Sequence, residues 1–196
     1  MSKGKIIVLG VLGAIVFTGM IACSTVLGTY NSIQRQTQVI NSAGSQITVQ
    51  MQRRYDLIPN IVSTVEGYAT LERTTFTAIA EARSKLGGAI QSGNLQQMAQ
   101  ANQTLGGVLG RLLMIQEQYP ELKANQGFLE LQAQLEGTEN RISVARQDYN
   151  EAVRNYNTYI SVFPNVVIAN FMGKQPREFF EATTDSVKTA PKVKFN

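Results

Sequence analysis

Two groups of charged side chains in this chain are of the types that take part in catalysis or ligand binding. In order they are Arg53, Arg54 and Asp56, then Glu136, Glu139, Arg141 and Arg146. Paired carboxylates can serve as general acid and base, and guanidinium groups bind anions. A catalytic pair would come with a nucleophile, a metal cluster or a phosphate loop, and none accompanies these residues. We therefore predict interhelical ion pairs that fix register, with a polar site for a partner or a lipid headgroup as the alternative.

The remaining composition excludes most enzyme chemistry. The chain has no His and a single Cys, so most metal sites and nearly every Ser–His or Cys–His arrangement are ruled out. Glycine-rich stretches at residues 87–88 and 106–110 lack the Lys-Ser/Thr of a phosphate loop, and no strand leads into them. We predict no catalytic residue, no metal and no cofactor, and therefore not an enzyme.

The charge balance argues against nucleic acid as a partner. The chain has 18 basic and 14 acidic residues, a formal charge of +4, and Lys3 and Lys5 supply two of the basic ones. The rest mixes both signs without the basic stripe of a nucleic-acid binder. Many polar positions are Gln rather than Lys or Glu, which is compatible with helix contacts between subunits, although solvent-exposed surface is the ordinary interpretation.

An uncharged segment near the N-terminus predicts a membrane anchor. The 22 residues 6–27 carry no charge, and as a helix they span roughly 33 Å, about the thickness of the hydrocarbon layer. Lys3 and Lys5 precede the segment, whereas the next basic residue is Arg35. The positive-inside rule then predicts a single-pass helix with a cytoplasmic N-terminus and an exported body.

A second interpretation of the same segment makes the chain a lipoprotein. Residues 20–23, Met-Ile-Ala-Cys, resemble the lipobox in which a small residue precedes the Cys that becomes acylated. Met at the first position departs from the usual Leu, and the apolar run is long for a signal peptide. We favour a retained transmembrane helix, in which Cys23 is a small lipid-facing residue, and keep acylation of Cys23 as the alternative.

Apolar residues recur at helical spacing beyond the anchor. One such pattern covers residues 31–58, and Pro59 predicts a kink or break because it removes a backbone donor and clashes with the preceding turn. The pattern then resumes and runs to residues 87–88, Gly-Gly, which we expect to form a turn. Asn94 with Gln97 three positions later predicts the capped start of a further helix.

The longest regular pattern lies between Gly127 and Pro164. Apolar or small residues alternate spacings of three and four there, at Phe128, Leu131, Leu135, Thr138, Ile142, Ala145, Tyr149, Ala152, Tyr156, Tyr159 and Phe163. Such a heptad repeat predicts one long helix with a left-handed coiled-coil seam.

These elements together predict an all-α protein. We expect an N-terminal transmembrane helix followed by an up-and-down bundle of long antiparallel helices, three long and one short, because the connecting loops are short. The short helix is expected at residues 176–187. The predicted domains are an anchor at residues 1–29, a helical bundle at 30–188 and an extended tail at 189–196.

Ordered blocks of residues resemble the LemA family of bacterial membrane proteins. The run Arg-Arg-Tyr-Asp-Leu-Ile-Pro-Asn at residues 53–60 matches the most distinctive of them. The others are residues 30–31, 67–69, 72, 82–83, 119–125, 138–142, 145–146, 149–150, 156–157 and 163–164. The similarity covers about residues 28 to 185.

The resemblance implies a helical bundle with an N-terminal anchor in the bacterial inner membrane, and it implies no reaction. Leu71 stands where the family often has His, which removes any His-based chemistry. Descriptions of the family often place the short N-terminus outside the cell, opposite to the direction that Lys3 and Lys5 predict, and we keep the prediction from charge.

The function expected from these observations is non-enzymatic. We predict a self-associating scaffold of the bacterial envelope with a role in membrane organisation, whose partners are the lipid bilayer and further copies of the chain. The alternative is a membrane-tethered adaptor or regulator that presents its bundle to another envelope protein.

Overall fold

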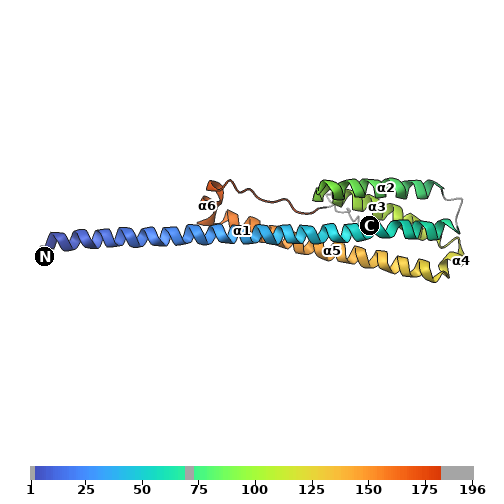
Figure 1. The fold of residues 1–196 in the computed structure, drawn as a ribbon, viewed down its shortest axis with the longest axis horizontal. Coiled ribbons are helices and arrows are strands. Elements are labelled where there is room, and N and C mark those ends of the chain that lie inside the picture. Colours follow the sequence, from blue (N-terminus) through green and yellow to red (C-terminus); the bar gives the residue numbers. More distant parts are fainter. Residues whose placement is uncertain (1–2, 69–72, 182–196) are drawn as a thin grey trace, which may run out of the picture. The chain divides into compact units, whose positions relative to one another are not determined.

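The computed structural model describes residues 3–68 and 73–181, and these contain helices and no strand. The helices are α1 (Lys3–Glu66), α2 (Arg73–Ser92), α3 (Leu95–Ile115), α4 (Pro120–Lys123), α5 (Gln126–Ser161) and α6 (Asn165–Phe171) (Figure 1). The predicted all-α class is therefore confirmed.

The chain divides into two compact units, each of which is described by itself. Residues Met1–Ser42 and Glu151–Glu178 form the first, here called the anchor unit, and Ala43–Asn150 with Phe179–Asn196 form the second, the bundle unit. The long helices α1 and α5 contribute to both. The predicted tail, residues 189–196, and Leu71 lie outside the described residues.

In the anchor unit, α1 begins as an isolated helix. Every described side chain from Gly10 to Gly28 is exposed, and α1 is the one helix in the described part of the chain long and apolar enough to cross a membrane. Among the described side chains of α1, Thr29 is the first that is buried, and its Oγ1 donates a hydrogen bond to Asn165 Oδ1 at 3.0 Å. From Ile33 onward the helix has an apolar face packed inside the unit.

The bundle unit has a continuous apolar core from α1, α2, α3, α4 and α5. Within each helix the most enclosed side chains recur at intervals of three, four or seven residues: Ile47, Met51, Ile58, Ile61, Ile79, Leu86, Met98, Leu105, Leu112, Leu122 and Phe128. Such spacing puts them on one face of each helix, and burial of a large aliphatic side chain contributes about 1.5–3 kcal/mol.

Pro59 was predicted to cause a kink or a break, and the structure shows that it does not break the helix. It lies inside α1, which continues to Glu66. Pro59 has no N–H for the Tyr55 carbonyl four residues earlier, but Arg83 Nε of α2 donates to that oxygen at 3.3 Å. The Arg83 guanidinium also stacks on the Tyr55 ring, 4.0 Å from its centroid. Tertiary contacts thus satisfy the group that Pro59 leaves unpaired.

The predicted turn at residues 87–88 is also wrong, because both glycines lie inside α2. A Cβ on Gly87 would come within 3.0 Å of Tyr55 Cε2, so this glycine permits α1 and α2 to approach closely. The turn falls instead at Gly93, whose φ of 65° is the left-handed conformation that glycine favours. Asn94 caps α3 as predicted, its Oδ1 accepting from the Gln97 N–H at 3.0 Å.

The short helix predicted at residues 176–187 is wrong over its described part. Residues 174–181 are not helical, and residues 182–187 lie outside the described residues. The short helices are α4 and α6 instead. The backbone at Arg177 and Phe180 is held by side chains of α5, as the next subsection describes, so its hydrogen-bonding groups are satisfied without a helix.

The heptad pattern fits α5 except at its end. Its positions from Phe128 to Tyr156 are mostly buried, but Phe163 lies beyond the helix and is 83% exposed. Val153 and Ile160, which lie outside the predicted seam, are buried instead. A straight helix of 3.6 residues per turn drifts by about 20° per heptad from a strict repeat, so the buried face moves away from the predicted positions.

Candidate functional site: a buried arginine in the bundle unit

Arg54 is the charged side chain most enclosed by the bundle unit. It is 6% exposed, and its position on α1 between Met51 and Ile58 puts it on the core face of that helix. Its Nη1 donates to a carboxylate oxygen of Glu139 on α5 and, at 2.8 Å, to Asn102 Oδ1 on α3. A buried cation is costly unless it is paired and hydrogen-bonded. Arg54 therefore links three helices.

The remaining guanidinium hydrogen-bonding capacity is incompletely used. Arg54 Nε is buried and has no partner among the described residues. The carboxylate of Glu139 is about half exposed, so water reaches one side of the ion pair. In this network the Arg54 guanidinium is thus enclosed by protein, whereas the Glu139 carboxylate is in contact with water.

A small polar pocket of about 200 Å³ adjoins this network in the bundle unit. Its lining is Ala99, Asn102, Gln103, Glu139, Ile142, Ser143, Arg146 and Phe180. Amide, hydroxyl, carboxylate and guanidinium groups can hold water or a small polar molecule there through hydrogen bonds. In the described part of the chain, no three His, Cys, Asp or Glu residues are grouped as a metal site would require.

Two asparagines of α5 hold non-helical backbone by paired hydrogen bonds. In the bundle unit, Asn150 Oδ1 accepts from the Phe180 N–H at 2.8 Å and its Nδ2 donates to the Phe180 carbonyl at 3.2 Å. In the anchor unit, Asn157 does the same for Arg177, at 2.8 and 2.9 Å. Sequence reasoning missed this role, although the Tyr-Asn pair repeated at a spacing of seven signals it.

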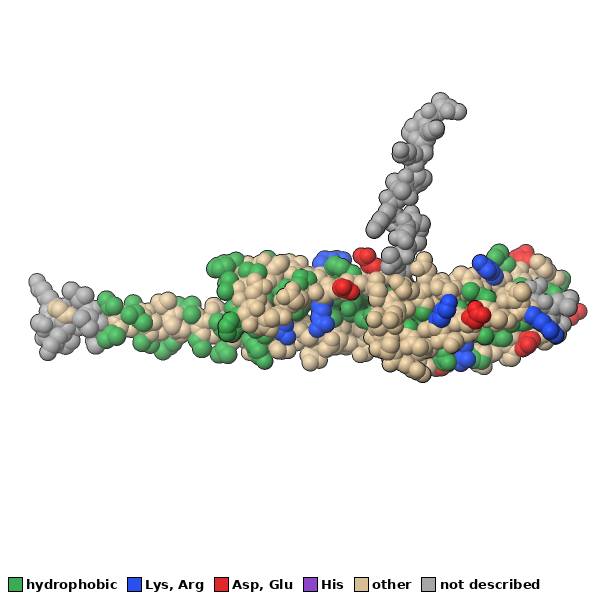
Figure 2. Space-filling view, turned by 90° about the horizontal axis from the view of Figure 1, so that it is seen from above, with side chains coloured by type: hydrophobic (Ala, Val, Ile, Leu, Met, Phe, Trp, Pro, Cys, Tyr) green, Lys and Arg blue, Asp and Glu red, His purple; other side chains and the backbone are tan. Residues whose placement is uncertain are grey.

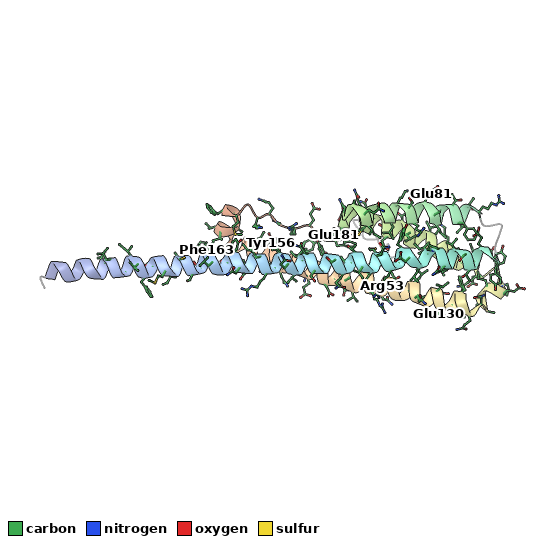
Figure 3. The ribbon with its side chains drawn as sticks, viewed as in Figure 1. Arg53, Glu81, Glu130, Tyr156, Phe163 and Glu181 are labelled. Carbon is green, nitrogen blue, oxygen red and sulfur yellow. The ribbon has the colours of Figure 1, made fainter. Side chains whose placement is uncertain are left out.

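A shallow groove of about 700 Å³ runs between α1 and α5 on the bundle unit. Its charged lining is Arg53 and Asp56 from α1 with Glu130 and Arg141 from α5, two of which are labelled in Figure 3. Leu57, Asn60, Ala133, Gln134, Gly137 and Thr138 complete it. We call this surface the outer groove. It combines small residues with charges of both signs.

The seven charged residues singled out from the sequence are divided among these features. Arg54 and Glu139 form an ion pair between α1 and α5. Asp56 and Glu136 accept hydrogen bonds within their own helices, from Gln52 Nε2 at 2.9 Å and Gln132 Nε2 at 3.1 Å. The rest line the two hollows, Arg53 and Arg141 the outer groove and Arg146 the polar pocket.

An apolar N-terminal helix that continues into a helical bundle is the organisation of a membrane-associated helical protein. The chain belongs to the LemA family, whose profile matches residues 43–195. It is 28% identical over 204 aligned positions to Magnetosome protein MamQ 2 of Paramagnetospirillum magneticum, which covers 92% of this chain and 74% of that one. It is 26% identical over 157 positions to Protein LemA of Metamycoplasma hominis, covering 80% of this chain and 71% of that one.

Proposed function

We propose that this protein is a non-enzymatic, membrane-anchored scaffold of the bacterial envelope whose copies associate through the outer groove. The relatives named for the magnetosome support a setting in membrane organisation. A single apolar helix per copy would hold all copies in one plane and one orientation, which raises their effective concentration. Weak contacts between bundles then suffice for assembly.

The observation that carries this proposal is the composition of the outer groove. Arg53 and Arg141 share it with Asp56 and Glu130, so two copies related by a twofold axis can place basic groups opposite acidic ones. Gly137 and Ala133 leave room for a helix to approach. Mixed charge of this kind gives specificity of pairing rather than large affinity, which suits a protein concentrated in a membrane.

Cross-linking in the membrane tests the self-association. In a chain carrying Cys23→Ser, a Cys at Gln134 in the outer groove should give covalent dimers with a short bifunctional thiol reagent. A Cys at Gln91, which is also exposed but lies on α2, is the matched control and should give few dimers. Equal yields at both positions, or no dimer at Gln134 in folded protein, would contradict the scaffold.

The adaptor remains the second candidate, because the same groove could receive a different envelope protein. The size of the detergent-extracted protein separates the two functions. A homogeneous assembly of many copies supports the scaffold, whereas a monomer that co-purifies with one other protein at fixed ratio supports the adaptor.

The proposal includes an orientation in the inner membrane, with the N-terminus cytoplasmic and the body exported. It rests on Lys3 and Lys5 before the apolar run and Arg35 as the next basic residue. Anchoring by acylation at Cys23 is the alternative.

A further inference from the structure

The corner where α5 passes into α6 exposes large apolar side chains in the anchor unit. Phe163 is 83% exposed and Phe171 is 94% exposed, and Val162 and Val167 beside them are also largely exposed. Soluble proteins expose single apolar residues everywhere, but aromatic rings gathered with nothing packed on them mark a site that contacts another apolar phase. We call these four residues the apolar corner.

The geometry of α6 accounts for this exposure. Val167 and Phe171 are four residues apart and lie on one face of the helix. Ala169, two residues from each and on the opposite face, is 1% exposed. The helix therefore presents Ala169 to the interior of the anchor unit and Val167 and Phe171 outward, while Val166 and Ile168 are half-buried. Exposure of two large apolar side chains on one face is unfavourable in water.

The apolar corner is next to the point where α1 would leave the lipid. The uncharged run of α1 ends at residue 27, and Thr29 donates to Asn165, the first residue of α6. Asn165 is two residues from Phe163. In Figure 3, Phe163 lies closer to the N-terminal length of α1 than Tyr156 does, and in Figure 2 hydrophobic side chains line that length and gather again at α6.

We infer that the apolar corner is a second membrane contact, in which Phe163, Val167 and Phe171 sit in the interfacial layer of the same bilayer that α1 enters. The continuity with the apolar helix identifies lipid as the occupant, because the hydrogen bond from Thr29 keeps Asn165, where α6 begins, within about one helical turn of the end of the uncharged run. Amphipathic helices bury such a face at the boundary between headgroups and acyl chains. Two contacts would fix the rotation of α1 about its own axis.

The absence of Trp from the sequence permits a direct test with single-Trp variants of the full chain in lipid vesicles. Phe163→Trp and Phe171→Trp are placed at the apolar corner. Phe17→Trp lies near the middle of the uncharged run and reports the bilayer interior, and Val144→Trp, exposed on α5 of the bundle unit, reports water. Emission is compared in vesicles of phosphatidylcholine brominated either high or low on the acyl chain.

The Trp emission of Phe163→Trp and Phe171→Trp should have a blue-shifted maximum and be quenched chiefly by lipid brominated high on the acyl chain. The emission of Phe17→Trp should be quenched chiefly by lipid brominated low on the chain. Val144→Trp should remain unquenched in both. Corner residues that stay unquenched in folded protein would overturn the inference. A second result would also overturn it. If the emission maximum of a corner Trp is blue-shifted, is not quenched by bromine and returns to longer wavelength on dilution into excess lipid, the apolar corner contacts a second copy of the chain and not lipid.

Discussion

At the scale of single residues, the ion pair of Arg54 and Glu139 is asymmetric. The arginine side chain is 7% exposed and the glutamate side chain 53% exposed. Water can solvate the carboxylate if its partner is removed, but it reaches the guanidinium poorly. Breaking a buried pair is most costly when a buried charge is left without a partner.

We therefore expect Glu139→Leu to destabilise the folded state more than Arg54→Leu does. The loss from Glu139→Leu should be about 3 kcal/mol because the buried cation keeps only its amide partner, whereas Arg54→Leu leaves a carboxylate that is half in water. Denaturant unfolding of both variants measures the difference.

Glu136→Leu is the control for this prediction, because Glu136 is exposed and bonds within its own helix. Its effect should stay within about 0.5 kcal/mol. If Arg54→Leu proved the more damaging change, the cation would be holding the three helices together by more than charge compensation.

At the scale of elements, two adjacent glycines of α2 have opposite roles. Gly87 lies against the Tyr55 ring of α1, and Gly88 has nothing within 4 Å of the place where a Cβ would stand. Both are inside a helix, where Ala is favoured over Gly by about 1 kcal/mol. Their difference therefore isolates the effect of the α1–α2 contact.

Gly88→Ala should raise the melting temperature, and Gly87→Ala should lower it. In the second case the helical gain is outweighed by a methyl group 3.0 Å from Tyr55 Cε2, an overpacking whose cost is about 1–3 kcal/mol. Thermal unfolding followed by circular dichroism measures both variants in parallel. An increase of similar size for both would mean that Tyr55 moves aside freely and that the close approach has no energetic consequence.

At the scale of the whole molecule, two modes of attachment to the membrane predict mature proteins of different mass. Cys23 is exposed and lies inside α1, within the uncharged run. Retention as a transmembrane helix predicts that the membrane-extracted protein keeps the residues before Cys23. Cleavage before Cys23 with added acyl chains would instead remove 22 residues and establish a lipoprotein. Intact mass spectrometry distinguishes the two.

Much of the helical architecture follows from spacing alone. The run of uncharged residues, the apolar face of residues 31–58, the capped start of α3 at Asn94 and most of α5 are local patterns, and local sequence decides them. Part of the candidate site could also be predicted from the spacing of residues in the sequence. A charged residue in phase with Met51 and Ile58 must face the core and must find a partner there, as Arg54 does.

The tertiary structure decided the positions at which a residue from a distant part of the chain overrides the local preference for a helix, a turn or a break. Pro59 predicts a break, but Arg83 from another helix takes the carbonyl that it leaves unpaired. Gly87 predicts a turn, but its lack of a side chain makes room for Tyr55 instead. A helix was predicted at residues 176–187. In its described part, Asn150 and Asn157 instead form hydrogen bonds with the backbone of Phe180 and Arg177, which satisfies these groups without a helix. The sequence by itself determined the long helices and most of their buried faces, because those depend on neighbours three and four residues away. Contacts between residues far apart in the chain decided where helices end, which charges pair and which apolar rings stay exposed.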